Sequence, residues 1–408
     1  MKKNTKKILV VTERWYPDTF GGSERLAFEQ VQGLADAGFS VDVFVATNMR
    51  ALPLTEHTDQ HITIHRAPGA LAIPGNQLYS INVQSRKPLA ALLTAERYDA
   101  ILCHHPQIGD AVLTYRVGTK NFHTPLLYFF HSSQPQEIRV DGPNRSYPGK
   151  AIWNEIVAQY VEAKEHRILR AADHIMVFSA FSSNILHTLN NAAWEHSEII
   201  SPGINTDLYD TVFERRQTHT GSFTPDTTAK TRFFTIRRLT KRMGLHLLIQ
   251  ALGTDPLAHT YELRIAGSGA MESELKKLAA QFPKLTVHFL GNISMKELES
   301  ELIHADAFVL PTIALEGFGI ATLEALLSGV PVIATNVGAT PELLQPINPA
   351  MIADGANIDA LQKAVHHFTD LSQKERIALG KKCRSVSLKA YSADAMNKKI
   401  IKAIKRFS

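Results

Sequence analysis

The chain has 408 residues, more than the roughly 100 to 200 of a typical domain, so two domains are expected. Its composition, 44% hydrophobic and 20% charged, is that of an ordinary globular protein. The two cysteines, Cys103 and Cys383, are far apart and lack metal-ligand spacing, which argues against a disulfide framework. The apolar run 8–11 is too short for a signal peptide and no run approaches the roughly 18 residues of a membrane helix, so we expect a cytoplasmic protein.

The net charge of +5 is unevenly distributed along the chain. Residues 373–408 contain eleven Lys or Arg and two acids, a net +9, which leaves −4 for the remainder. The last stretch interleaves lysines with isoleucines, and the favoured interpretation is a helix that packs through its apolar stripe. Weak peripheral contact with an anionic membrane surface is the alternative. Basic residues are not interleaved with aromatic ones, so nucleic acid is not expected as a partner.

In chain order, the first half alternates short apolar stretches with helical patterns. Strands are predicted at 8–12, 41–47, 61–67, 100–103, 126–130 and 174–178, and helices at 23–37, 87–95 and 153–171. Such alternation is typical of a parallel sheet with helices on both faces, in which ligands bind beyond the carboxyl ends of the strands.

Polar residues follow several of these strands. Gly21 and Gly22 precede a serine that can cap a helix, and they let the backbone approach a ligand; a tight turn with a cap is the structural alternative. His131 directly follows an apolar strand. His104 and His105 also follow a strand, and as neighbours they are expected to point to opposite faces and not to form a metal pair.

Residues 210–230 are polar, rich in threonine and without clear periodicity, and are predicted to be a linker. In the second half, strands are predicted at 231–236, 262–266, 286–290, 307–310 and 330–334, and helices at 245–252, 271–282 and 295–304. The predicted organisation is an N-terminal domain (1–209), this linker, a C-terminal domain (231–385) and a last helix (386–408) that packs back on the N-terminal domain. The fold class is α/β, with two doubly wound, Rossmann-like domains facing each other across a cleft.

Residues 310–334 carry the strongest local pattern, which is strand, glycine-rich loop, helix and strand. Free loop amides and the positive end of the helix near Gly319 suit a phosphate or diphosphate. Glu316 lies in the loop and Glu324 in the helix, although carboxylates repel phosphate. Such a pair of carboxylates is useful when the ligand also has hydroxyl groups. A nucleoside diphosphate sugar has both a diphosphate and hydroxyl groups.

Other nucleotide-binding and hydrolase motifs are incomplete or missing. The run from Gly267 to Gly269 follows a strand but lacks the third glycine of a dinucleotide-binding fingerprint, and neither a P-loop nor a nucleophile elbow occurs. Four cations directly after the strand 231–236 are well placed to hold a leaving diphosphate, with a solvated turn as the structural alternative. These cations are Arg237, Arg238, Lys241 and Arg242.

Together, these motifs resemble those of the retaining glycosyltransferases of family 4, which have the GT-B fold, and the resemblance covers nearly the full length. The matching residues are Gly21, Gly22, Glu24, His131, Arg238, Leu239, Gly267, Gly269, Glu316, Gly317, Phe318, Gly319 and Glu324. The two glutamates with Gly-Phe-Gly after the first are the most specific of these signals.

The resemblance implies a role for each position. Arg238 and a neighbouring cation bind the diphosphate, with help from backbone amides. The amides belong to Gly21, Gly22, Phe318, Gly319, Ile320 and Ala321. Glu316 holds hydroxyls of the donor sugar, Glu324 binds the ribose, and His131 lies near the sugar and the acceptor. The chain departs from the family at Met243, where lysine is common, and Arg242 or Lys241 is expected to take over that charge.

The implied reaction moves a sugar from a nucleoside diphosphate donor to an acceptor hydroxyl with retention, by front-face attack in which the leaving phosphate accepts the proton. No cofactor and no metal are expected, because the cations take the place of a metal. Glu316 as a nucleophile is the mechanistic alternative. A sugar-nucleotide epimerase or hydrolase, or a non-catalytic sugar-nucleotide-binding protein, are the alternative functions. The loops 20–24 and 132–149 are expected to shape the site for an acceptor that the sequence leaves open.

Overall fold

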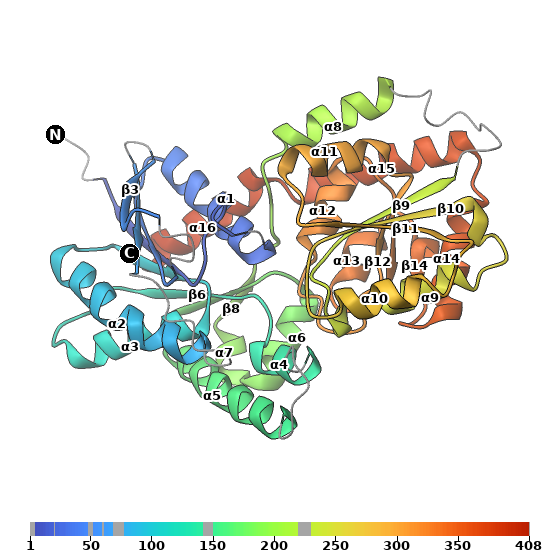
Figure 1. The fold of residues 1–408 in the computed structure, drawn as a ribbon. Coiled ribbons are helices and arrows are strands. Elements are labelled where there is room, and N and C mark those ends of the chain that lie inside the picture. The colour runs from blue at the N-terminus through green and yellow to red at the C-terminus, as the bar shows by residue number, and fades with distance from the viewer. Residues whose placement is uncertain are drawn as a thin grey trace. The chain divides into compact units, whose positions relative to one another are not determined.

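The computed structural model describes residues 5–19, 21–47, 52–58, 61–67, 77–141, 150–218 and 230–407. Phe20, residues 142–149 of the predicted acceptor loop and residues 219–229 of the predicted linker lie outside this set. The chain forms two compact units, each built on its own sheet (Figure 1). Unit 1 comprises Met1–Ile138, Ile152–Ile204 and Ala393–Ser408, and unit 2 comprises Arg139–Ala151 and Asn205–Ser392.

Unit 1 holds an eight-stranded sheet in the order β3-β4-β2-β1-β5-β6-β7-β8, parallel throughout except for the antiparallel pair β3 and β4. Its strands are β1 (Lys7–Thr12), β2 (Ser40–Val45), β3 (Thr55–His57), β4 (Ile62–Arg66), β5 (Ala100–Cys103), β6 (Leu126–Phe130), β7 (His174–Val177) and β8 (Ser197–Ile199). The helices of this half of the chain are α1 (Gly22–Asp36), α2 (Gln77–Ala95), α3 (Pro106–Gly118), α4 (Gln134–Asp141), α5 (Lys150–Ala171), α6 (Ala180–Leu189) and α7 (Asn191–Glu195). The central strands β5 and β6 are apolar and buried at every position, as expected for strands covered on both faces.

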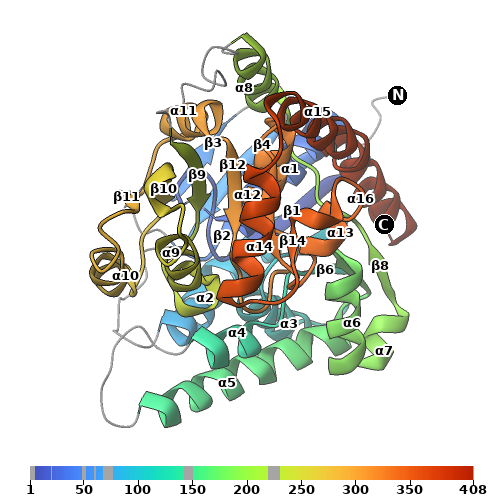
Figure 2. The ribbon, with the colours of Figure 1, turned by 90° about the vertical axis from the view of Figure 1, so that its right-hand side faces the viewer.

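Unit 2 holds a fully parallel six-stranded sheet in the order β11-β10-β9-β12-β13-β14. Its strands are β9 (Thr231–Ile236), β10 (Tyr261–Ala266), β11 (Thr286–Gly291), β12 (Ala307–Leu310), β13 (Val332–Thr335) and β14 (Ile352–Ala353). Its helices are α8 (Asp207–Thr218), α9 (Leu245–Gly253), α10 (Glu272–Ala279), α11 (Met295–His304), α12 (Ile320–Leu327), α13 (Thr340–Leu344), α14 (Ile358–Thr369) and α15 (Gln373–Ala390), with short 3₁₀ turns at Lys241–Met243, Ala258–Thr260 and Pro349–Met351. Helices α8, α11, α12 and α15 lie on one side of this sheet and α9, α10 and α14 on the other (Figures 1 and 2).

Much of the predicted linker is a helix in the structure. Helix α8 extends to Thr218, whereas the sequence predicts no regular structure from residue 210 onward. The buried Arg216 fixes α8 to unit 2, because its Nη1 donates to the carbonyl oxygens of Leu302, Ile303 and Ala305 at 2.5, 2.9 and 2.8 Å. The last carbonyls of a helix lack partners inside it, so the end of α11 accepts this arginine readily. The helix also buries Tyr209 and Val212, so an arginine occupies one of its three buried positions and weakens the apolar periodicity of the sequence.

The C-terminal helix α16 (Ala393–Phe407) packs on α1 within unit 1 (Figure 1). Its buried apolar stripe consists of Met396, Ile400, Ala403 and Ile404. Nδ2 of Asn397 donates to the carbonyl oxygen of Glu29 at 3.3 Å. The apolar stripe of this helix is thus buried, and the helix contacts α1. Within the described residues, no helix combines the length and the apolar character that crossing a bilayer requires.

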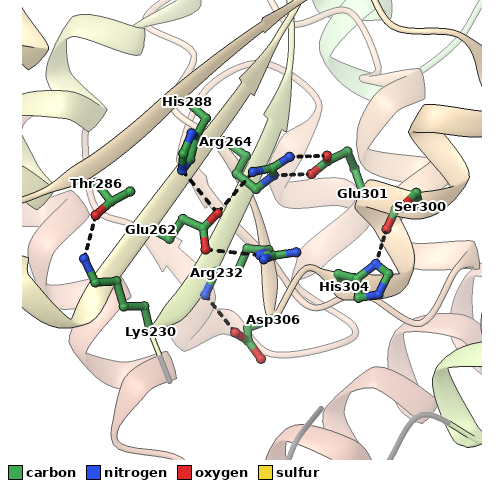
Figure 3. Close-up of polar contacts among 10 residues, drawn as sticks. All are labelled: Lys230, Arg232, Glu262, Arg264, Thr286, His288, Ser300, Glu301, His304 and Asp306. Carbon is green, nitrogen blue, oxygen red and sulfur yellow. Dashed lines mark hydrogen bonds and ion pairs between the residues drawn. The ribbon is translucent and has the colours of Figure 1, made fainter. Parts of the chain in front are cut away.

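An ion-pair network lies toward the amino ends of β9, β10 and β11 (Figure 3). Glu262 contacts Arg232 at 3.3 Å, Arg264 at 3.1 Å and His288 at 3.6 Å. Arg264 also donates from Nε and Nη2 to Glu301 of α11 at 2.6 Å each. Side chains of neighbouring strands lie side by side on one face of a sheet, so packing alone explains this network. We assign it a structural role.

Candidate active site

Each unit brings its predicted site residues to the carboxyl ends of its central strands. In unit 2, β9 and β12 are neighbours at the point where the strand order reverses, which is where ligands bind in open α/β sheets. The cation-rich loop follows β9, and the glycine-rich loop follows β12. In unit 1 the corresponding point lies between β1 and β5. The loops there carry Gly21 and Gly22, and His104 and His105.

The glycine-rich loop of unit 2 presents unpaired backbone amides. Gly319 is the N-cap of α12 with φ 87°, a left-handed conformation that glycine adopts without strain. Within the described part of the chain, the N–H groups of Phe318, Gly319, Ile320 and Ala321 donate to no protein acceptor. Oγ1 of Thr322 is buried and has no hydrogen-bond partner either. Free donors at a helix N-terminus form an anion-binding site.

Glu316 is held beside these amides by two donors. Its Oε2 accepts from Nη2 of Arg237 at 2.5 Å and from Oγ1 of Thr312 at 3.0 Å. Burial by itself would raise the pKa of the Glu316 carboxyl group. The charge of Arg237, the hydrogen bonds from Arg237 and Thr312, and the charge of Arg242 outweigh burial and lower that pKa. Glu316 is therefore an ionised hydrogen-bond acceptor, which is what holding sugar hydroxyls requires.

The loop around Glu316 is anchored on both sides. A Cβ added at Gly338 would lie 2.1 Å from the carbonyl oxygen of Glu316, so only glycine lets these backbones approach. The Phe318 side chain is buried and packs edge-on against Tyr391, with 5.3 Å between the ring centroids. The partly exposed Gly317 lies between these two anchors. The amides are thus fixed in place before any ligand arrives.

The cations after β9 occupy different environments. Arg238 and Lys241 are exposed, whereas Arg242 is buried and donates from Nη1 to the carbonyl oxygen of Leu315 at 3.0 Å. Arg237, to which the sequence analysis gave no individual role, is the cation paired with Glu316. Its position as the first residue after the strand was the signal that could have identified it.

Gly267 and Gly269 support the cation-rich loop. A Cβ at Gly267 would lie 1.9 Å from the carbonyl oxygen of Arg237, and one at Gly269 would lie 2.5 Å from that of Leu239. The Leu239 N–H donates to the carbonyl oxygen of Ser268 at 2.9 Å. The two loops therefore pack backbone against backbone. Both glycines were predicted to bind substrate. Their close packing against the cation-rich loop is by itself a structural reason for glycine at these two positions.

Glu324 on α12 contacts a tyrosine that the sequence analysis missed. Its Oε1 accepts from the hydroxyl group of the fully buried Tyr209 at 2.8 Å. The two residues are 115 positions apart, so no local pattern relates them. A buried phenol that donates to a carboxylate fixes its orientation. Tyr209 thus positions the carboxylate that the resemblance assigns to the ribose.

In unit 1, a second set of free amides lies at the start of α1. Gly21 is its N-cap in an extended conformation and makes no side-chain cap. A Cβ at Gly21 would lie 2.2 Å from Oε2 of Glu24, which accepts from Oγ of Ser23 at 2.8 Å. The N–H groups of Gly22, Ser23 and Glu24 find no acceptor among the described residues. Gly21 therefore leaves room for the carboxylate of Glu24, and the three amides that follow it are available to an acceptor.

His131 packs among two other histidines, which corrects the expectation that His104 and His105 point apart. Nε2 of His131 and Nδ1 of His104 share a hydrogen bond of 3.1 Å, and the rings of His131 and His105 stack with centroids 5.7 Å apart. Both neighbours follow β5, where strand alternation no longer applies. Burial lowers the pKa of His105 and of His131 to about 3, helped at His105 by the charge of Arg14 and at His131 by the interaction with His105, which outweighs the opposite effect of Glu24. All three imidazoles are therefore neutral at neutral pH, since the His104 pKa is lowered as well.

Glu13, also missed in the sequence, lies beside this histidine cluster. Its backbone N–H donates to Nδ1 of His105 at 3.3 Å, and its Oε1 is buried without a partner. Burial is the main cause that raises the pKa of Glu13 to about 7. The charge of Arg14 acts against this rise, and the charge of Glu24 adds to it. Within the described residues, no group of three or more His, Cys, Asp or Glu side chains is arranged to hold a metal ion.

Known proteins resemble both halves of the chain. Residues 20–208 match Glycosyltransferase Family 4, and residues 223–386 match Glycosyl transferases group 1. An uncharacterised glycosyltransferase of Methanocaldococcus jannaschii is 26% identical over 364 residues, which cover 86% of this chain and 88% of that protein. The structure of sucrose-phosphate synthase from Thermosynechococcus elongatus superposes with a TM-score of 0.81 at 19% identity, covering 98% of both chains. HepE of Anabaena, solved with UDP-glucose, gives a TM-score of 0.68 at 17% identity, covering 98% of this chain and 99% of that one. Two parallel-sheet units and these neighbours confirm the predicted GT-B fold.

Proposed function

Because the chain belongs to glycosyltransferase family 4 and is a glycosyltransferase, we propose that it transfers a sugar from a nucleoside diphosphate sugar to an acceptor hydroxyl with retention at the anomeric carbon. The row of free amides from Phe318 to Ala321, with the ionised Glu316 beside it, carries this proposal. Free amides suit the diphosphate and an ionised carboxylate suits sugar hydroxyls. The UDP-glucose held by HepE of Anabaena supports a donor of this class.

In the proposed reaction, the bond between the anomeric carbon and the phosphate oxygen breaks, and the acceptor oxygen bonds to the same face of that carbon. The bonding electrons leave with the diphosphate, whose oxygen takes the proton of the acceptor hydroxyl. No side-chain base is needed for this step. Stabilising the departing charge is the largest task, and one well-placed donor contributes roughly 3 kcal/mol. Arg238 and the loop amides supply such donors, and we propose that they make a metal ion unnecessary.

The remaining side chains hold the substrates in this scheme. Glu316 accepts hydrogen bonds from the donor sugar, and Glu324, oriented by Tyr209, accepts them from the ribose. His131 offers a neutral imidazole in unit 1, and a pKa of about 3 suits hydrogen bonding better than proton abstraction near neutral pH. The amides of Gly22 to Glu24 in unit 1 offer further donors to an anion.

A diphosphate-release assay tests the proposal. The purified protein is incubated with UDP-, GDP- and ADP-sugars, alone and with a panel of saccharide and lipid-linked acceptors, and free nucleoside diphosphate is measured. Release that requires an acceptor, with a product whose anomeric configuration by NMR matches the donor, is the expected result. Acceptor-independent release would instead indicate a hydrolase, and an isomerised donor would indicate an epimerase. Binding without turnover of any donor would indicate a binding protein.

A further inference from the structure

Arg237 has an environment that no other cation of its loop shares. Its side chain is 7% exposed, follows β9 directly, and lies between Glu316 and Met243. Nη2 donates to Oε2 of Glu316 at 2.5 Å, while Nη2 and Nε contact the Met243 sulfur at 2.9 and 3.2 Å. The backbone is fixed too, because the Arg237 N–H donates to the carbonyl oxygen of Ala266 at 3.0 Å.

The contacts of Arg237 leave part of its guanidinium group available to a ligand. A guanidinium has five N–H donors, and a thioether is only a weak acceptor. Among the residues that the structure describes, Nη1 of Arg237 makes no hydrogen bond. Glu316 occupies one edge of the planar group, so a second anion can be bound at another edge.

Met243 makes this arrangement possible because it is neutral. It is 5% exposed and sits at the end of the 3₁₀ turn Lys241–Met243. A lysine in its place would put a second positive charge against Arg237 in a buried site, where like charges repel strongly. The guanidinium instead contacts the neutral Met243 sulfur and lies beside the carboxylate of Glu316.

We propose that Arg237 is the buried cation of the diphosphate site and binds the leaving diphosphate through Nη1 while its Nη2 holds Glu316 in place. This inference rests on the proposed function and deepens it, since it assigns the second cation of the diphosphate site to Arg237 in place of Arg242 or Lys241, which were expected to supply it. It also resolves the departure at Met243: the charge comes from the residue packed against that methionine. Lys241 is exposed and Arg242 is committed to the Leu315 carbonyl oxygen, so neither has this geometry.

Binding of UDP, GDP and ADP to the full chain, measured by isothermal titration calorimetry, tests the proposal. Arg237→Gln is expected to weaken binding of the diphosphate that binds the wild type best by roughly ten- to a hundredfold, the loss typical of a hydrogen bond to a charged group. The matched control is Arg232→Gln on the same strand, whose partner Glu262 lies in the structural network; its affinity stays within twofold of wild type.

A rescue variant separates missing charge from a disturbed loop. Lysine has the same unbranched shape as methionine, so Arg237→Gln with Met243→Lys is expected to regain most of the lost affinity, whereas Arg237→Gln with Met243→Leu is not. If Arg237→Gln fails to fold because Glu316 is left buried without its partner, Arg237→Gln with Glu316→Gln removes both charges. That double variant is expected to fold and still to bind weakly.

Two results would overturn the inference. One is diphosphate affinity within twofold of wild type in the Arg237 variants. The other is a loss of affinity that is recovered no better with lysine at position 243 than with leucine, because the cause would then be a displaced loop. A wild-type protein that binds none of the three diphosphates would refute the proposed function itself, so the two failures are distinguishable.

Discussion

Replacing Glu13 with glutamine should change how the stability of unit 1 depends on pH. The Glu13 carboxyl group has a pKa of about 7 in the folded protein against 4.5 for an ordinary glutamate. Between these values the folded chain binds a proton that the unfolded chain has released. The free energy of unfolding therefore falls as pH rises from about 4.5 to about 7, and it stays at the lower value above that range.

The size of this effect follows from the two pKa values. At about 1.4 kcal/mol per pH unit, the cost of ionising the buried carboxyl group at pH 8 is about 3 kcal/mol. Glutamine cannot ionise, so Glu13→Gln removes the whole of this cost at pH 8. At pH 5 most of the cost has not yet arisen, so the substitution changes the free energy of unfolding much less there. Burying the glutamine amide lowers the free energy of unfolding by the same amount at both pH values. The effect of the substitution at pH 8 minus its effect at pH 5 therefore reports only the titration of Glu13.

Urea unfolding at pH 5 and pH 8, followed by tryptophan fluorescence, measures this difference. The three tryptophans, Trp15, Trp153 and Trp194, all belong to unit 1, so the signal reports on the unit that contains Glu13. Glu195→Gln is the matched control, because that glutamate is exposed on α7 and, among the described residues, accepts a hydrogen bond only from Asn191. Equal pH dependence in wild type and Glu13→Gln would refute the account of the buried carboxyl group.

Four further outcomes are expected. Arg238→Ala lowers turnover of a nucleotide sugar far more than Glu24→Ala. Near-normal transfer by the Arg238 variant would show that Arg238 does not bind the diphosphate. Tyr209→Phe leaves the oxygen of Glu324 without its donor and raises the KM for the donor by roughly tenfold with little change in kcat, checked by initial-rate kinetics. Gly244→Ala lowers the unfolding midpoint strongly, because the new Cβ would lie 1.7 Å from the carbonyl oxygen of Pro311 at a position with φ 71°; an unchanged calorimetric midpoint would contradict the packing described. Transfer persists in excess EDTA, and loss of activity that Mg²⁺ or Mn²⁺ restores would show that the arginines do not replace a metal.

The sequence was sufficient for the buried strands. The bounds predicted at 100–103, 126–130, 231–236 and 307–310 are those of β5, β6, β9 and β12, because a strand covered on both faces is a short apolar run that ends where polar or turn-forming residues begin. Helices without a clear one-sided apolar pattern were missed. Helix α8 places the charged Arg216 at a buried position, and α3, which begins at Pro106, is buried at successive positions all round and so shows no amphipathic period.

The residues of the candidate site fall into two groups, those that a local sequence pattern identifies and those that depend on distant contacts. Glycines, Glu316 and Glu324 were identified because their spacing is local, and their roles in catalysis stay predictions. The contact of Arg237 with Glu316 and that of Tyr209 with Glu324 were missed, because the partners are 79 and 115 positions apart. Only the fold brings those pairs together, so no window of sequence reveals them.

The backbone-to-backbone packing of the cation-rich loop has a practical consequence for redesign. The carbonyl groups of Arg237 and Leu239 rest on Gly267 and Gly269, so the path of this loop is set by main-chain atoms. The exposed side chain at position 241 can therefore be varied while the main chain keeps its course and Arg238 stays in place. A library built there would vary charge and reach at a constant geometry, which makes this loop a suitable place to select for altered donor preference.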